Sequence, residues 1–229
     1  MPIMQKQQIK DYLYLKAEPK YAAFASSLIP KEQRLIGVRL PELRKLAGEL
    51  AKGDFRAYLS EADDETFEEI LLQGMVIGKA NMPFEEQMNL MTCYVSKISN
   101  WSLCDSACAG FKFVRKQRAY VWEFLRPYWE SRNEFEQRFA VVMLMDHFIT
   151  DEFIDRLISL WPEINPAGYY ASMAVAWAVS VCFVKYPDLT LPLLENKLLD
   201  TETHLRTIQK ILDSKRVDEN VKTHLRALK

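Results

Sequence analysis

The chain has 229 residues and a formal net charge of −1, with 30 Lys and Arg against 31 Asp and Glu. This balance excludes a globally basic protein, so any DNA-binding face must be a local cluster of cations. A composition of 49% hydrophobic and 27% charged residues excludes a disordered chain. Only 7 glycines favour long helices with short connections over sheets joined by tight turns.

Neither a membrane span nor a metal site is expected. The chain has no apolar run of about 18 residues, and its N-terminus has no run of signal length, so we predict a cytoplasmic protein. No C-x-x-C pair occurs and the three histidines are scattered, which argues against zinc. Cys104 and Cys108, one helical turn apart, are typical of the small apolar fillers of reduced proteins.

Apolar residues recur at helical spacing along the chain. After the start signal Asp63-Asp64-Glu65, the spacing of Phe67, Ile70 and Leu71 predicts a helix. Pro41 and Pro83 stand where a first helical turn would begin. The same periodicity returns in later runs: Phe135 to Met143, Phe153 to Trp161, Leu191 to Leu198, Leu205 to Leu212, and Val217 to Leu225.

These segments predict about a dozen helices in antiparallel pairs. The pairs span approximately 38–80, 84–130, 134–161, 168–200 and 202–227, near the two-helix repeat length of HEAT-type arrays. Strand-like alternation occurs only in Phe111-Lys-Phe-Val114, which is too short to build a sheet. We therefore predict an all-α fold, an α–α superhelix (solenoid) of HEAT-like repeats with a concave face, forming one domain over residues 1–229.

Trp101 and Asp105 are the most informative pair of side chains. They lie four residues apart in a segment predicted to be helical, so both should project from one face. A carboxylate beside an aromatic wall suits a ligand that is positively charged or becomes so. The alternative is a core Trp with a solvated Asp one turn later.

Four blocks of sequence, in this order, carry a family resemblance. They are Ile36-Gly-Val-Arg-Leu-Pro-Glu-Leu-Arg-Lys-Leu46, Asn100-Trp-Ser-Leu-Cys-Asp105, Gln137-Arg-Phe-Ala-Val-Val142 and Met173-Ala-Val-Ala-Trp-Ala178. Together they resemble the DNA alkylation repair family, the HEAT-like-repeat DNA glycosylases, from about residue 20 to about residue 225.

The resemblance implies an activity and a set of residue roles. The family's catalytic Trp and Asp match Trp101 and Asp105, its second active-site Trp matches Trp177, and its helix-start Arg matches Arg138. The implied reaction is hydrolysis of the N-glycosidic bond of cationic N3- or N7-alkylated purines in double-stranded DNA. The implied mechanism presses aromatic residues against the damaged nucleotide and uses no metal or organic cofactor.

Each of the other candidate residues could instead have an ordinary structural role. Arg138 could clamp a phosphate or could be a surface arginine paired with Glu134. Trp177 could hold a cationic sugar or pack in a core. Three basic clusters could bind DNA or form a solvated surface: Lys112, Arg115, Lys116 and Arg118; Arg34, Arg39, Arg44 and Lys45; and Lys210, Lys215 and Arg216.

Three departures from the family pattern keep a second hypothesis open. Trp177 is followed by apolar Ala178-Val-Ser-Val-Cys182 without the family's Arg, and Gln137 stands where a second Arg is common. The family has an N-terminal helix that helps to grip the duplex. In this chain that region differs, over residues 20–30 and the short connection 31–35. The alternative function is therefore a weak or inactive helical-repeat module that binds DNA structures or a protein partner.

Overall fold

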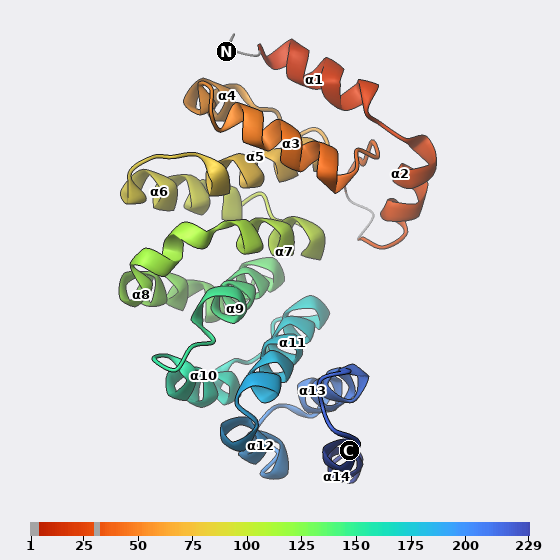
Figure 1. The fold of residues 1–229 in the computed structure, drawn as a ribbon, viewed down its shortest axis with the longest axis vertical. Coiled ribbons are helices and arrows are strands. Elements are labelled where there is room, and N and C mark those ends of the chain that lie inside the picture. Colours follow the sequence, from red (N-terminus) through yellow and green to blue (C-terminus); the bar gives the residue numbers. More distant parts are fainter. Residues whose placement is uncertain (1–4, 30–32) are drawn as a thin grey trace. The chain divides into compact units, whose positions relative to one another are not determined.

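The computed structural model describes residues 5–29 and 33–229, and every regular element within them is a helix (Figure 1). The all-α prediction is confirmed. The chain divides into two compact units, Met1–Phe113 and Val114–Lys229. The first contains α1 (Lys6–Leu15), α2 (Pro19–Ser26), α3 (Leu40–Leu50), α4 (Phe55–Glu61), α5 (Phe67–Lys79), α6 (Phe84–Val95) and α7 (Trp101–Gly110).

A 3-10 segment, η1 (Lys112–Lys116), follows α7 along the chain. The second unit contains α8 (Arg118–Trp129), α9 (Glu134–Phe148), α10 (Ile154–Leu160), the 3-10 segment η2 (Trp161–Glu163), α11 (Tyr169–Lys185), α12 (Pro187–Glu195), α13 (Thr201–Asp213) and α14 (Glu219–Arg226).

Alternate helices pack side by side within each unit. In the first unit α5 contacts both α3 and α7, and in the second α11 contacts both α9 and α13 (Figure 1). The intervening helices cover this row, as α8 does on α9 and α12 does on α11. This packing is that of helical repeats, so the predicted class is confirmed.

The predicted pair boundaries are wrong in part. The range 84–130 contains three helices, α6, α7 and α8. In the range 134–161, α9 contacts α10 but packs more extensively against α8 and α11. Apolar periodicity locates a helix but does not reveal which neighbour it packs against. The helices α1 and α2 precede all the predicted pairs, and residues 30–32 of the predicted connection lie outside the described residues.

The start of α5 shows how local sequence sets a helix boundary. Its N-cap is Thr66 and not the acidic run before it: the Thr66 hydroxyl accepts the Glu69 N–H at 3.3 Å, and the Glu69 carboxylate accepts the Thr66 N–H at 2.9 Å. This capping box satisfies two amides that the helix cannot bond itself. Pro41 lies in the first turn of α3, as predicted.

A buried carboxylate fixes the chain that leads into α3. Glu68, only 1% exposed, accepts the backbone N–H groups of Ile36, Gly37 and Val38 at 3.1, 2.7 and 3.1 Å. Gly37 has φ +95°, and a Cβ there would lie 2.4 Å from the Glu18 carbonyl oxygen. The turn therefore requires glycine, and Glu68 supplies the charge that satisfies its three amides.

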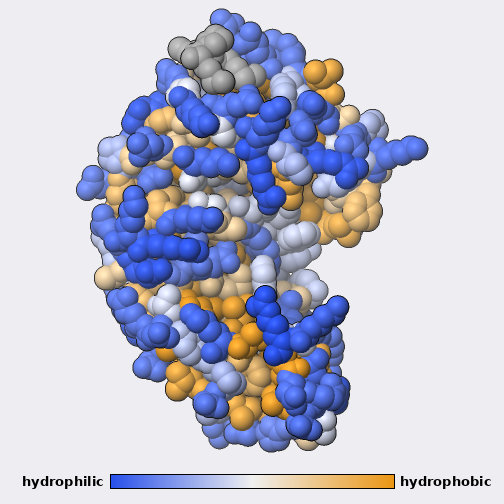
Figure 2. Space-filling model, viewed as in Figure 1, coloured by the Kyte–Doolittle hydropathy of each residue, from blue (hydrophilic) through white to orange (hydrophobic). Residues whose placement is uncertain are grey.

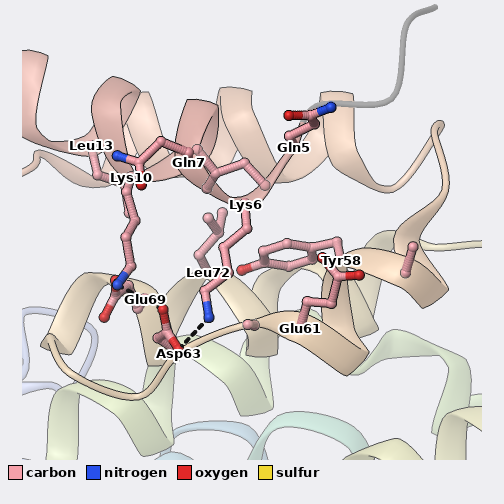
Figure 3. A pocket seen from close by; sticks show the side chains of 13 residues that line it. Gln5, Lys6, Gln7, Lys10, Leu13, Tyr58, Glu61, Asp63, Glu69 and Leu72 are labelled. Atoms are coloured by element: carbon pink, nitrogen blue, oxygen red, sulfur yellow. Dashed lines mark hydrogen bonds and ion pairs between the residues drawn. The ribbon is translucent and has the colours of Figure 1, made fainter.

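The helix α1 lies over a cavity of about 450 Å³ that faces α4 and the start of α5. Its apolar residues Ile9 and Leu13 are buried. Lys6 and Lys10 bridge to Asp63 at 2.6 and 2.7 Å, and Figure 3 shows both lysines reaching down from α1. Hydrogen bonds from Lys10 and then Lys6 lower the pKa of the Asp63 carboxyl.

Replacing Glu68 with Ala should lower the free energy of unfolding by about 3 kcal/mol, because three buried amides lose their acceptor. Urea denaturation measures the change. Glu85→Ala is the matched control, since Glu85 holds the same position after a Phe in the first turn of α6 but is exposed. The control should cost about 0.5 kcal/mol. Equal losses in the two variants would contradict the role given to Glu68.

Acid should release α1 before the rest of the first unit. Because the pKa of Asp63 is lowered in the folded state, its contribution is complete above the ordinary aspartate pKa of about 3.9 and is lost as pH falls through the lower folded value. Hydrogen-exchange protection of the α1 amides should therefore fall as the pH drops below the ordinary aspartate pKa, and Asp63→Asn should reproduce that fall at pH 7. Unchanged α1 protection in the variant would refute this attachment.

Candidate functional site

The helix α7 begins at a buried asparagine that fixes its first turn. The Asn100 side-chain oxygen accepts the N–H groups of Ser102 and Leu103, both at 3.0 Å. Its amide nitrogen donates to the Gln33 side-chain oxygen at 3.2 Å. Asn100 is 1% exposed, so the cap is shielded from competing water. The first residue after this cap is Trp101.

Trp101 and Asp105 lie one turn apart on α7, and both are partly exposed. Leu103, Cys104 and Ala107 are fully buried on the same helix. The helix therefore turns an apolar side to the core and leaves the Trp–Asp pair accessible. Full burial of Trp101 would have favoured the reading of a core Trp, and the partial exposure argues against it.

The orientation of the Trp101 ring is set from the N-terminal segment. Its indole Nε1–H donates to the Leu28 carbonyl oxygen at 2.9 Å, just beyond the end of α2. Phe24 and Leu28 of this segment are 61% and 53% exposed. The segment before Gly37 thus has a structural role at Trp101 that the sequence does not reveal.

Arg138 is buried, at 5% exposure, near the start of α9. Its Nη1 donates to the Tyr170 carbonyl oxygen at 2.8 Å. Glu134 accepts the Tyr170 N–H. The burial of Arg138 contradicts the reading of a surface arginine. Gln137 bridges the Trp129 and Asn165 carbonyls, both at 3.0 Å. Glu134 and Arg138 thus join α9 to the first turn of α11, and Gln137 joins it to the end of α8 and to the segment before α11.

The basic cluster after α7 divides into two kinds of residue. Arg118 Nε donates to the His147 carbonyl at 2.7 Å, and Arg115 Nη2 donates to the Asp146 carbonyl at 3.2 Å. Both carbonyls lie in the last turn of α9, where helix acceptors lack partners and cations are stabilising. Lys112 and Lys116 are exposed on the same segment.

The N-terminal cluster divides in the same way. Arg39 forms a two-point bond with Glu18 at 2.7 and 2.8 Å and lies over the Tyr21 ring at 4.8 Å. The hydrogen bond from Arg39 lowers the pKa of the Glu18 carboxyl. Arg44 is exposed and makes no ion pair with the described residues. DNA contact stays a prediction for all of these cations.

Trp177 is partly exposed and lines an open groove in the second unit. The groove has a volume of about 590 Å³ and is named the Trp177 groove below. It is lined by Trp177, Ser180, Val181, Val184, Lys185, Lys210, Asp213, Ser214 and Arg216. In Figure 2, apolar residues reach the surface over α11 and strongly hydrophilic side chains lie beside them.

Comparison with known proteins supplies the family. The model of the family described as DNA alkylation repair enzyme matches residues 9–166. The chain belongs to the DNA alkylation repair enzyme family. No curated protein matches the chain, and no solved structure does.

The family match divides the candidate residues. Trp101, Asp105 and Arg138 lie within the matched region, whereas Trp177 lies beyond its end. Trp101 and Asp105 belong to the first compact unit, and Arg138 and Trp177 belong to the second. The family match therefore covers the α7 pair and does not reach the Trp177 groove.

The described residues contain no group of three or more His, Cys, Asp and Glu side chains placed to hold a metal ion. None of the described helices is both long and apolar enough to cross a membrane. Sequence reasoning missed the Leu28 carbonyl, because a main-chain acceptor leaves no signal in residue type. Asn100 could have been found, since Asn is among the preferred N-cap residues.

If Arg118 caps α9, its loss should destabilise the protein without DNA. Arg118→Gln should lower the free energy of unfolding by about 1–2 kcal/mol, because the His147 carbonyl loses a charged donor. Lys116→Gln, on the same segment, should change it by less than about 0.5 kcal/mol. Urea denaturation measures the free energy of unfolding of both variants. Equal losses in the two variants would contradict the capping role of Arg118.

Proposed function

We propose that this chain is a DNA glycosylase that hydrolyses the N-glycosidic bond of cationic N3- or N7-alkylated purines in double-stranded DNA. The observation that carries the proposal is the pair Trp101 and Asp105, held one turn apart on the accessible side of α7. Membership in the DNA alkylation repair enzyme family supports repair of DNA as the setting.

The chemistry needs few protein groups. An alkylated purine already carries a positive charge, so it leaves as a neutral base without a proton donor. Cleavage of the C1′–N9 bond gives the electron pair to the base and leaves an oxocarbenium-like sugar. The oxygen of a water molecule then bonds to C1′, and its proton passes to Asp105 or to solvent.

Asp105 and Trp101 suit this charge development. A carboxylate that α7 holds in place would stabilise the cationic sugar and orient the water. The Trp101 ring presents an electron-rich face, and a cation–π contact of this kind contributes about 0.5–2 kcal/mol. Because the Leu28 carbonyl already holds the indole N–H, the ring needs no reordering when the substrate arrives.

Arg138 and Trp177 have supporting roles in this proposal. Arg138 would hold a backbone phosphate, and its bond to the Tyr170 carbonyl would keep the guanidinium oriented for that contact. Trp177 would pack on the lesion nucleotide. Neither a metal nor an organic cofactor takes part, because the substrate's own charge activates the leaving group.

One observation favours a second candidate, a module that binds DNA without releasing bases. Arg138 is buried and donates to the main chain, so its guanidinium already has a structural task in α9 and α11. Such a module would bind DNA with the salt dependence of phosphate contacts and would leave the alkylated bases in place.

Purified protein should release N7-methylguanine or N3-methyladenine from an alkylated duplex, measured by chromatography and mass spectrometry of the free bases. Asp105→Asn should reduce release by about 100-fold or more, because the charge that stabilises the cationic sugar is removed. The control Asp155→Asn removes an exposed carboxylate in the first turn of α10 and should leave the rate unchanged.

Release no faster than in an enzyme-free sample would reject the glycosylase. If the same sample still binds the duplex, the second candidate takes its place. Matching thermal unfolding of the Asp105→Asn variant and the parent would show that the lost activity does not reflect lost folding.

A further inference from the structure

The cavity beneath α1 is separate from every residue given a role in the proposed function. It has a volume of about 450 Å³, and all the residues that line it belong to α1, α4, α5 and the link between α4 and α5, within the first unit. Pockets that hold small organic molecules have volumes of about 300–1,000 Å³. Since a cavity of about 150 Å³ already admits benzene, this one has room for one or two substituted rings.

Two facing helices give the cavity apolar walls. Ile9 and Leu13 line it from α1, and Leu72 lines it from α5. All three side chains are buried in the folded chain. A ligand with an apolar body is therefore stabilised here by leaving water, as a core side chain is.

The charged side chains on the lining are already paired or solvated. Lys6 and Lys10 bridge to Asp63 at 2.6 and 2.7 Å. Glu69 accepts the N-cap amide of α5 at 2.9 Å and lies 3.8 Å from the Lys10 ammonium. The remaining acid on the lining, Glu61, is exposed, so an ion pair with it would contribute little. A charged ligand would have to displace one of these partners, so the lining favours a neutral one.

Tyr58 brings a polar group into this cavity. Figure 3 shows its hydroxyl pointing into the space beneath α1. Among the residues that the structure describes, none forms a hydrogen bond with this hydroxyl. Burial raises the pKa of Tyr58, and the Glu69 and Asp64 carboxylates raise it further. The phenol therefore stays protonated at neutral pH, and its O–H is a donor that a ligand oxygen can satisfy.

We propose that the cavity beneath α1 binds a small neutral molecule with an apolar ring and one carbonyl oxygen, of the aryl ketone or aryl amide class. The ring lies between the apolar side chains of α1 and α5, and the carbonyl accepts the Tyr58 O–H. Because such a ligand touches both helices, it ties α1 to the rest of the first unit. The proposal is independent of DNA binding and of base release.

The test uses three compounds that share a benzene ring: neutral acetophenone, anionic benzoate and cationic benzylamine. Their binding to the full chain is followed by amide NMR spectra. Acetophenone should bind with a Kd on the order of 1 mM, as expected for so small a compound, and should shift the amides of α1, α4 and the start of α5. Benzoate and benzylamine should bind at least about tenfold more weakly, because each adds an unpaired charge.

The variant Tyr58→Phe removes the hydroxyl and keeps the ring. It should weaken acetophenone binding about 5- to 10-fold, because the buried carbonyl loses its donor. Binding of ethylbenzene, which lacks the carbonyl, should change by less than about twofold in the same variant. Tyr14→Phe is the matched control, since Tyr14 lies on α1 at 47% exposure and does not line the cavity. It should leave the binding of both compounds unchanged.

Each part of the proposal has an outcome that overturns it. Acetophenone that shifts no amides in α1, α4 or α5 would overturn the site. Benzoate or benzylamine that binds as tightly as acetophenone would overturn the neutral ligand class. Equal losses of acetophenone and ethylbenzene binding in Tyr58→Phe would overturn the carbonyl contact. Since none of these measurements contains DNA, a failure here leaves the glycosylase standing, and a failure to release bases leaves this site standing.

Discussion

A single buried carboxylate holds together the part of the chain on which the candidate site depends. Glu68 binds the amides of residues 36–38, and the Gly37 carbonyl then accepts the Glu18 N–H at 3.1 Å. Glu18 is the N-cap of α2, and the segment that ends α2 supplies the Leu28 carbonyl that holds the Trp101 indole. The orientation of Trp101 is thus linked to a buried carboxylate that lies on another helix, α5.

The helices were predictable from sequence, because each must bury one apolar stripe and the periodicity records that stripe. The sequence predicted a capped helix start before α5 but not the residue that forms the cap. The acidic run at 63–65 was the predicted start signal, whereas the Thr66 hydroxyl accepts the helix N–H. The order of stacking was not predictable, since the apolar stripe of α8 is the same whether it faces α7 or α9. Glu68 also gave no signal, because an acid in a first helical turn is usually exposed.

Residue type alone could not separate cations that serve the fold from cations available to a ligand. Arg115 and Arg118 stand in a basic run, yet both reach carbonyls at the end of α9. A guanidinium meets a helix C-terminus and a phosphate with the same donors, so only coordinates distinguish the two uses. At Trp177 the residues that follow are apolar, and the cations beside the groove include Lys210 on α13, which packs directly against α11, and Arg216 in the turn after α13.

The buried side of α7 has a consequence for the chemical durability of the protein. Reagents that alkylate DNA are electrophiles, and in proteins they react with thiolates. Cys104 and Cys108 are fully buried behind the Trp101–Asp105 pair, and burial raises the pKa of the Cys182 thiol to about 12. Exposed Cys93 on α6 is therefore the thiol that such reagents reach first. The packing that presents the Trp–Asp pair thus also shields the helix beneath it from the agents that create its proposed substrates.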